Sequence, residues 1–376
     1  MIMSKQLRIA VVQMNAVVGG LAKNRDKIIA GMLQAKAYGC DLVAFPELCI
    51  TGYPPEDLVS RRQFIIDQRQ VLDEIINYSN DIISVVGFVD GDRILYNAAA
   101  VVQNKALVTT YHKIQLPNYS VFDEERYFES GKTPLILDIE GCKVGISICE
   151  DIWIEGSVTE TEAIQGGAEV LLNLSASPYA AGKVKERISL LNERSRFCRA
   201  FVVYANLVGG QDELVFDGSS MIVNPEGEII VMASRFDEDL IALDIDFSSV
   251  IETRKNPAYL EQTRRFKSPF PACRSITLAR STPQQTCELK PRTFNLMISE
   301  EEEIYSALIL GLRDYVLKNG FQHIILGLSG GIDSALVAAL AADALGAECV
   351  HGVTMPSRYS SSGSVNDSYQ LAGNLN

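Results

Sequence analysis

The chain has 376 residues, of which 47% are hydrophobic and 22% charged, enough for about two folded domains with cores of their own. Its net charge of −13 argues against nucleic acid as the main partner, because binding to phosphates needs an excess of Lys and Arg. No apolar run is long enough to span a membrane, and the first residues do not read as a secretory signal. The eight cysteines form no CxxC pair, so neither a disulfide framework nor a zinc site is indicated. These features predict a cytoplasmic enzyme or binding protein that associates with neither membranes nor nucleic acid.

Strands and helices alternate in the first third of the chain, and hairpins follow. Buried strands are predicted where β-branched and other apolar residues cluster, and helices where apolar residues recur at helical spacing. The alternating elements are strands at 7–14, 41–47 and 83–89 and helices at 23–39 and 61–79. The predicted hairpins pair 95–103 with 106–113 and 135–141 with 142–151.

The next third returns to alternation and ends in another hairpin. Helices are predicted near 157–166 and at 182–199, strands at 169–177 and 200–208, a hairpin at 219–233 and a closing strand at 240–246. Residues 209–220 are interpreted as a rim loop. This order of elements predicts two sheets with helices on their outer faces, an α-β-β-α sandwich over residues 1–266.

Residues 267–295 break the pattern with prolines and scattered Ser, Thr and Gln, so they are predicted to be a linker. Ser299 then caps an amphipathic helix that leads into a strand at 321–329. Residues 296–376 are predicted to form the first part of a doubly wound α/β domain. Because only two strands follow the linker, we expect the chain to be part of a longer protein.

A glycine turn joins the strand at 321–329 to an alanine-rich helix. Ser329, Gly330 and Gly331 form the turn, and Asp333 and Ser334 open the helix. The first N–H groups of a helix lack internal partners and lie at the positive end of its dipole, so a phosphate chain is the natural ligand. The Walker pattern would require Lys after the last glycine, where Ile332 stands. A Gly-Gly turn with a capping Asp and Ser and no ligand is the alternative.

Three predicted strand ends carry reactive side chains. Glu47 ends the first of these strands, Lys113 the second and Cys149 the third, and neighbouring strand ends would bring them together. A free thiol is mostly protonated at neutral pH; a nearby ammonium favours the thiolate, and a carboxylate can take the proton. Taken singly, each has a structural alternative: a loop acid, a surface base and a buried inert cysteine. The chain has only three histidines, interpreted as structural or surface residues, so a Ser-His or Cys-His pair is not expected.

The strings FPE, HK and CED, in this order, resemble the catalytic motifs of the nitrilase superfamily over roughly residues 5–265. The resemblance implies that Glu47 is the general base, Lys113 stabilises the oxyanion and Cys149 is the nucleophile. It also matches Glu124 to a second glutamate that orients Lys113. Tyr53 and Ser177 match positions that line the amide pocket in the glutamine-using branch, although a structural role for each is equally open.

SGGIDS, residues 329–334, is similar to the pyrophosphate loop of the ATP-pyrophosphatase family. Joined to a nitrilase-like domain, it resembles the glutamine-dependent NAD⁺ synthetase family. That resemblance implies hydrolysis of glutamine and ATP-driven amidation of nicotinate adenine dinucleotide to NAD⁺. Ser329, Gly330, Gly331, Asp333 and Ser334 would hold ATP with its Mg²⁺, further Mg²⁺ ligands would lie beyond Asn376, and the protein is expected to form a homo-oligomer.

Two alternatives to this function remain open from the sequence. The first is a stand-alone amidase with a vestigial nucleotide-binding segment. The second is a nucleotide-binding interaction module whose first domain has lost its activity.

Overall fold

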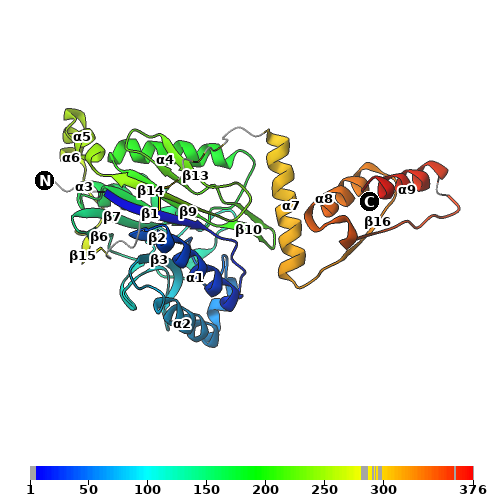
Figure 1. Cartoon of the computed structure of the whole chain (residues 1–376), viewed down its shortest axis with the longest axis horizontal. Helices are drawn as coiled ribbons and strands as arrows, with labels where there is room; N and C mark the ends of the chain where they lie inside the picture. Colours follow the sequence, from blue (N-terminus) through cyan, green and yellow to red (C-terminus); the bar gives the residue numbers. More distant parts are fainter. Residues whose placement is uncertain are drawn as a thin grey trace.

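The computed structural model describes residues 6–280, 287–289, 292, 294, 299–359 and 361–375. Two sheets packed face to face, with helices outside them, form the larger part of the molecule, and a smaller helical segment extends from it (Figure 1). The α-β-β-α sandwich predicted from the order of elements is therefore confirmed.

The first sheet has six strands in the order β14-β1-β2-β3-β4-β5. β1, β2 and β3 are parallel, whereas β14, β4 and β5 pair antiparallel with their neighbours. The strands are β1 (Gln6–Gln13), β2 (Leu42–Ala44), β3 (Ile83–Gly91), β4 (Leu95–Gln103), β5 (Ala106–His112) and β14 (Asp239–Asp246). β5 is the last strand, so one of its edges pairs with no other strand of the sheet.

The second sheet has seven strands in the order β13-β12-β9-β8-β7-β6-β15. Its strands are β6 (Leu135–Ile139), β7 (Cys142–Ile148), β8 (Val170–Ser175), β9 (Phe201–Asn206), β12 (Met221–Val223), β13 (Ile229–Met232) and β15 (Arg274–Leu278). Apolar side chains of both sheets, such as Ile9, Val85, Val144 and Leu172, form one buried core between them. Strands buried on both faces read as nearly continuous apolar runs, which is why they were predictable.

Helices cover both outer faces. α1 (Leu21–Ala37) and α2 (Arg62–Ile76) pack on the first sheet, where Ile28 and Leu72 are fully buried. α3 (Val158–Ile164) and α4 (Lys183–Cys198) cover the second sheet, where Leu191 is fully buried. Short 3₁₀ helices lie in the loops: η1 (Glu56–Ser60), η2 (Glu124–Arg126), η3 (Cys149–Ile152) and η4 (Ala347–Cys349).

Three segments differ from the sequence-based prediction. Residues 209–220, interpreted as a rim loop, contain the hairpin of β10 (Val208–Gln211) and β11 (Leu214–Asp217). Two helices, α5 (Ser248–Arg254) and α6 (Pro257–Arg265), follow β14 and were not predicted. Within the predicted linker, β15 pairs in parallel with β6. These elements are four to nine residues long, so each is too short to show a clear period among polar neighbours.

The C-terminal segment begins with α7 (Glu300–Lys318), whose N-cap Ser299 accepts a hydrogen bond from the Glu302 N–H. It continues through β16 (Ile324–Gly327), α8 (Ile332–Leu345), β17 (Val350–Val353) and α9 (Ser362–Leu375). β16 and β17 form a two-stranded parallel sheet. No helix in the described part of the chain is long and apolar enough to cross a membrane.

α7 stands between the sandwich and the rest of this segment (Figure 1) and packs against the β10–β11 hairpin. The carboxylate of Asp314 accepts hydrogen bonds from Gly210 N at 2.7 Å and from Asn15 Nδ2 at 2.6 Å. Lys318 Nζ donates to the carbonyls of Ala16 and Gly210, each at 2.8 Å. Buried polar groups thus fix α7 against the sandwich.

Candidate active site

Glu47, Lys113 and Cys149 lie at the ends of strands that are not neighbours. Glu47 follows β2 in a turn, and Lys113 follows β5 directly, but β3 and β4 lie between these two strands. Cys149 follows β7, which belongs to the other sheet. The expectation of adjacent strand ends was therefore wrong, and the residues meet because the two sheets face each other.

Lys113 is completely buried between two carboxylates. Its Nζ lies 2.7 Å from Glu47 Oε1 and 2.8 Å from Glu124 Oε1. Burial tends to lower the pKa of Lys113, but the charges of Glu124 and Glu47 outweigh it and hold that pKa well above its usual value. The lysine is therefore an ammonium at neutral pH.

Donors from the surrounding strands fix both glutamates. Asn97 Nδ2 on β4 donates to Glu47 Oε1 at 2.7 Å, and Ala176 N donates to Glu47 Oε2 at 2.9 Å. Tyr53 Oη donates to Glu124 Oε1 at 2.9 Å. Burial raises the pKa of Glu124, although the lysine opposes the shift. Asn97 was missed from the sequence, because an Asn inside an apolar strand has no motif around it.

Cys149 is the first residue of η3 and has a φ of +42°, a left-handed backbone conformation that residues other than glycine rarely adopt. Such strain is typical of functional positions and holds the side chain in one direction. The residue is 3% exposed. Burial raises the pKa of the Cys149 thiol well above its usual range, Glu47 adds to this rise, and Lys113 opposes it.

Lys113 lowers the pKa of the Cys149 thiol, as expected from the sequence, but burial and the charge of Glu47 outweigh this effect. Burial and the nearby carboxylates together favour the thiol form of Cys149, so a reaction at the sulfur would need a group that takes its proton.

Asp151 is buried and connects the turn at Cys149 to the strand that precedes Lys113. Its role was not predicted from the sequence. Its carboxylate accepts hydrogen bonds from Ile148 N at 2.9 Å, Gln115 N at 2.8 Å and Tyr111 Oη at 2.7 Å. Burial raises its pKa to about 6 against the effect of these donors, so it is ionised at neutral pH. Its place in the CED string was the available signal in the sequence. Its contacts, which link the segments around positions 113 and 149, are visible only in the structure.

Tyr53 and Ser177 occupy different surroundings. Tyr53 belongs to the buried network through Glu124. Ser177 Oγ accepts a hydrogen bond from Arg187 at 3.3 Å, and Arg187 forms a two-point ion pair with Asp217, both contacts at 3.0 Å. Both members of that pair are buried, so Ser177 rests on a fixed support. Their predicted contact with substrate stays a prediction.

A second carboxylate follows the cysteine. Glu150 is 7% exposed, and the Tyr119 hydroxyl lies 3.1 Å and 3.0 Å from its two oxygens. Among the residues that the structure describes, no other cation or donor holds this carboxylate. Glu150 thus provides negative charge beside the candidate nucleophile.

The predicted phosphate loop has the geometry of a strand–turn–helix. It spans Leu328–Gly331 between β16 and α8, and Gly330 has a φ of +79°. A side chain at Gly330 would collide with the backbone of Ser364 on α9, so only glycine fits. Ser329 Oγ and Ser334 Oγ lie 3.1 Å apart and close the turn. Asp333 lies exposed in the first turn of α8.

A two-sheet sandwich with a Glu–Lys–Glu network and a strained cysteine turn defines a nitrilase-like protein. Comparison with known families agrees: the chain belongs to the carbon-nitrogen hydrolase family, whose model matches residues 8–255. A second model, that of NAD synthase, matches residues 304–376.

Relatives combine the two parts. The chain is 40% identical to the glutamine-dependent NAD(+) synthetase of Thermotoga maritima over 99% of its length and 42% identical to that of Aquifex aeolicus over 98%. It spans 64% of the length of each of these relatives.

Solved structures give the same result. The glutamine-dependent NAD+ synthetase of Acinetobacter baumannii in complex with ADP matches with a TM-score of 0.82 and 36% identity, over 99% of this chain and 63% of that one. A Nesterenkonia amidase of the nitrilase superfamily has the same sandwich fold, with a TM-score of 0.58 and 23% identity over 69% of this chain and 97% of that one.

Proposed function

We propose that this chain carries the glutamine-hydrolysing half and the beginning of the ATP-using half of a glutamine-dependent NAD⁺ synthetase. The substrates would be glutamine, ATP and nicotinate adenine dinucleotide, and the setting the cytoplasm. The observation that carries the proposal is the buried Lys113, whose Nζ lies 2.7–2.8 Å from two carboxylates. Asp151 links the end of the lysine strand to the Cys149 turn through hydrogen bonds from the backbone of both. The family matches in both halves and the synthetase relatives support it.

The residues support a two-step hydrolysis through a thioester. Glu47 takes the Cys149 proton as the sulfur attacks the carboxamide carbon, and Lys113 stabilises the oxygen that becomes negative. Glu47 then gives the proton to the leaving nitrogen, and ammonia departs as the C–N bond breaks. Water, activated by Glu47, hydrolyses the thioester to glutamate and restores the thiol. Glu124 holds Lys113 in place throughout.

Glu150 offers the matching charge for an amino-acid substrate. Glutamine differs from a simple amide by its α-ammonium and α-carboxylate. A mostly buried carboxylate beside the nucleophile can bind the ammonium, and Tyr119 holds that carboxylate in position. This contact would favour glutamine over simple amides.

The C-terminal segment supports the ATP-dependent step. The N–H groups that open α8 lack acceptors within the helix, and the turn around Gly330 lets a phosphate chain approach the backbone. No cluster of three or more His, Cys, Asp or Glu that could hold a metal occurs in the described ranges. Mg²⁺ with nucleotides usually uses one or two carboxylates together with phosphates, and Asp333 could supply one. When bound, ATP would activate the carboxylate that ammonia then converts to the amide.

Cys149→Ala tests the proposal. It is expected to lower glutamine hydrolysis by a factor of about 10⁴ or more, since no other group can form the thioester. In the complete gene product the variant should still make NAD⁺ from added ammonia but not from glutamine. Cys198→Ala, a buried cysteine on α4, is the matched control and should retain hydrolysis. Full glutamine hydrolysis by Cys149→Ala would refute the proposal.

The same measurements also distinguish the proposed function from the alternative of a stand-alone amidase. Glutamine hydrolysis without any ATP-dependent synthesis would favour a stand-alone amidase. The domain limits of 1–266, 267–295 and 296–376 and the expected homo-oligomer also remain proposals, to be checked by limited proteolysis and sedimentation.

A further inference from the structure

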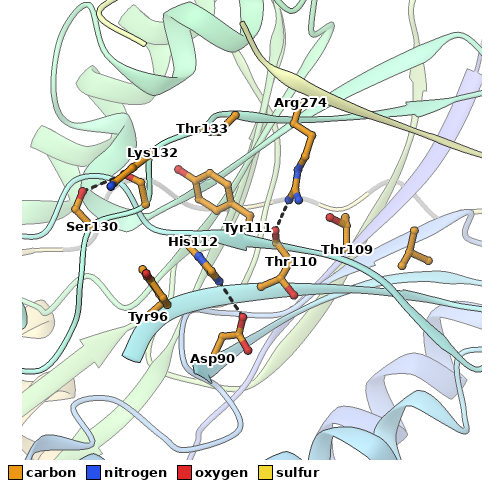
Figure 2. A pocket seen from close by; sticks show the side chains of 12 residues that line it. Asp90, Tyr96, Thr109, Thr110, Tyr111, His112, Ser130, Lys132, Thr133 and Arg274 are labelled. Atoms are coloured by element: carbon orange, nitrogen blue, oxygen red, sulfur yellow. Dashed lines mark hydrogen bonds and ion pairs between the residues drawn. The ribbon is translucent and has the colours of Figure 1, made fainter. Parts of the chain in front are cut away.

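A cavity of about 620 Å³, whose lining includes neither Glu47 nor Lys113, lies beside the open edge of β5 (Figure 2). β5 is the last strand of the first sheet and β15 the last strand of the second, and both contribute to its wall. We call it the β5-edge pocket and define it by Tyr96, Thr110, His112, Lys132, Thr133 and Arg274.

The pocket is cationic, although the chain as a whole carries a charge of −13. Lys132 and Arg274 line it, and the ion pairs found among the described residues include neither of them. Arg274 instead donates to the Thr110 carbonyl. Both side chains therefore bring positive charge that no carboxylate in the described ranges neutralises.

The one carboxylate of the lining is already engaged. Asp90 Oδ2 lies 2.8 Å from His112 Nε2, and Asp90 Oδ1 lies 3.2 Å from an Arg69 nitrogen. Figure 2 shows Asp90 directed at His112 and not toward Lys132 or Arg274. The ring of His112 is stacked on Tyr96, with centroids 4.0 Å apart. Asp90 is therefore engaged by His112 and Arg69 and does not pair with Lys132 or Arg274.

Backbone donors add to the side-chain charges. Lys113 N donates to Asn97 O, so the N–H of residue 113 faces β4. In an antiparallel pair, successive N–H groups of a strand point alternately toward and away from the partner strand. The N–H groups of Thr110 and His112 therefore point toward the open edge of β5. The bond from Arg274 to the Thr110 carbonyl lies on this same side. N–H groups, a guanidinium and an ammonium around one cavity are the usual partners of phosphate and carboxylate groups.

We propose that the β5-edge pocket is a binding site for a small metabolite that carries two or more oxyanion groups, phosphate or carboxylate. The site is separate from both proposed reaction centres and does not depend on their activity. Its wall is the strand that ends at Lys113, and Tyr111 of the same strand donates to Asp151. A ligand here would therefore touch the element that positions the buried lysine.

The histidines provide a direct test. Because the chain contains only His112, His323 and His351, ¹³C-histidine labelling gives three ring signals, and His112→Gln identifies the one in the pocket. Pyrophosphate and citrate are the probes, titrated separately through the millimolar range against sodium chloride of equal ionic strength. We expect saturable movement of the His112 signal, with pyrophosphate alone indicating a phosphate ligand and citrate alone a carboxylate ligand.

Charge variants make the test specific. Lys132→Met with Arg274→Met should weaken binding at least tenfold, whereas Lys132→Arg with Arg274→Lys should preserve it. Lys23→Met with Arg264→Met removes the same charge from exposed helical positions and should leave binding unchanged. Unsaturable movement, equal binding by the first variant, or movement confined to His323 and His351 would overturn the proposal.

Discussion

Lys113 decides the chemistry of the buried network at the scale of single residues. Two carboxylates within 2.8 Å keep it charged in a site that excludes water, and their combined charge opposes ionisation of Cys149. A lysine paired with one carboxylate would leave a neutral pair, and the cysteine would then ionise more easily. In the proposed reaction, the second glutamate therefore makes transfer of the thiol proton a necessary step.

The pH dependence of Cys149 alkylation follows from this balance. The pKa of Cys149 is raised, so the thiolate fraction between pH 7 and 9 is smaller than for a free cysteine, for which the pKa is about 8.5. Modification by iodoacetamide should therefore keep rising above pH 9. Mass spectrometry of the Cys149 peptide measures the rate, with the exposed Cys287 as internal reference. A plateau reached below pH 8 would contradict the charge balance.

Asp151 determines how two elements meet. It accepts hydrogen bonds from the backbone just after β5 and at the start of η3. One carboxylate therefore fixes the backbone beside both Lys113 and Cys149. A carboxylate can accept all of these bonds, whereas an amide replaces one acceptor with a donor.

Asp151→Asn should therefore destabilise the fold by about 2 kcal/mol, because buried N–H groups lose their acceptor. It should also lower kcat for glutamine with little change in KM, since the reacting groups shift but the substrate contacts remain. Urea unfolding and steady-state kinetics measure the two effects. Asp92→Asn, at an exposed turn, is the control and should change neither. A normal kcat in a destabilised Asp151→Asn protein would reduce Asp151 to a purely structural residue.

α7 and the β10–β11 hairpin approach closely through glycines. A Cβ at Gly210 would lie 2.9 Å from Gly311 Cα, so alanine there would push α7 away from the sandwich. We expect Gly210→Ala to cost about 2 kcal/mol and to increase hydrogen exchange in α7. Gly373→Ala is the control, because a Cβ there meets nothing within 4 Å. Unchanged exchange in α7 would show that the contact is not needed for docking.

At the scale of the whole molecule, single substitutions should separate the two activities proposed above. Asp333 lies at the exposed phosphate loop, in the C-terminal segment that α7 separates from the sandwich (Figure 1). In the complete gene product, Asp333→Ala should lower ATP-dependent pyrophosphate release by about 10² and leave glutamine hydrolysis unchanged. Asp367→Ala, at an exposed position of α9, should change neither. Retained pyrophosphate release in Asp333→Ala would count against the phosphate loop.

The sandwich, and the placement of Glu47, Lys113 and Cys149 just after strands, could be predicted from local sequence alone. Runs such as 83–89 and 170–174 are apolar enough to be strands buried on both faces, and FPE, HK and CED stand at strand ends as local strings. The turn at Gly330–Gly331 was also readable, because a glycine pair before a helix start has few other uses. These features depend on neighbours within a few residues.

Only the tertiary structure decided how the reactive positions meet. Glu47 and Lys113 follow two strands of the first sheet that are separated by two other strands. Cys149 follows a strand of the second sheet, so no local pattern encodes how the three residues approach one another. The second carboxylate on Lys113, the Asn97 and Asp151 supports and the unneutralised cations at the β5 edge are likewise long-range contacts. Charge balance and burial are sums over such contacts, which is why the direction of the pKa shift of Cys149 became clear only from the fold.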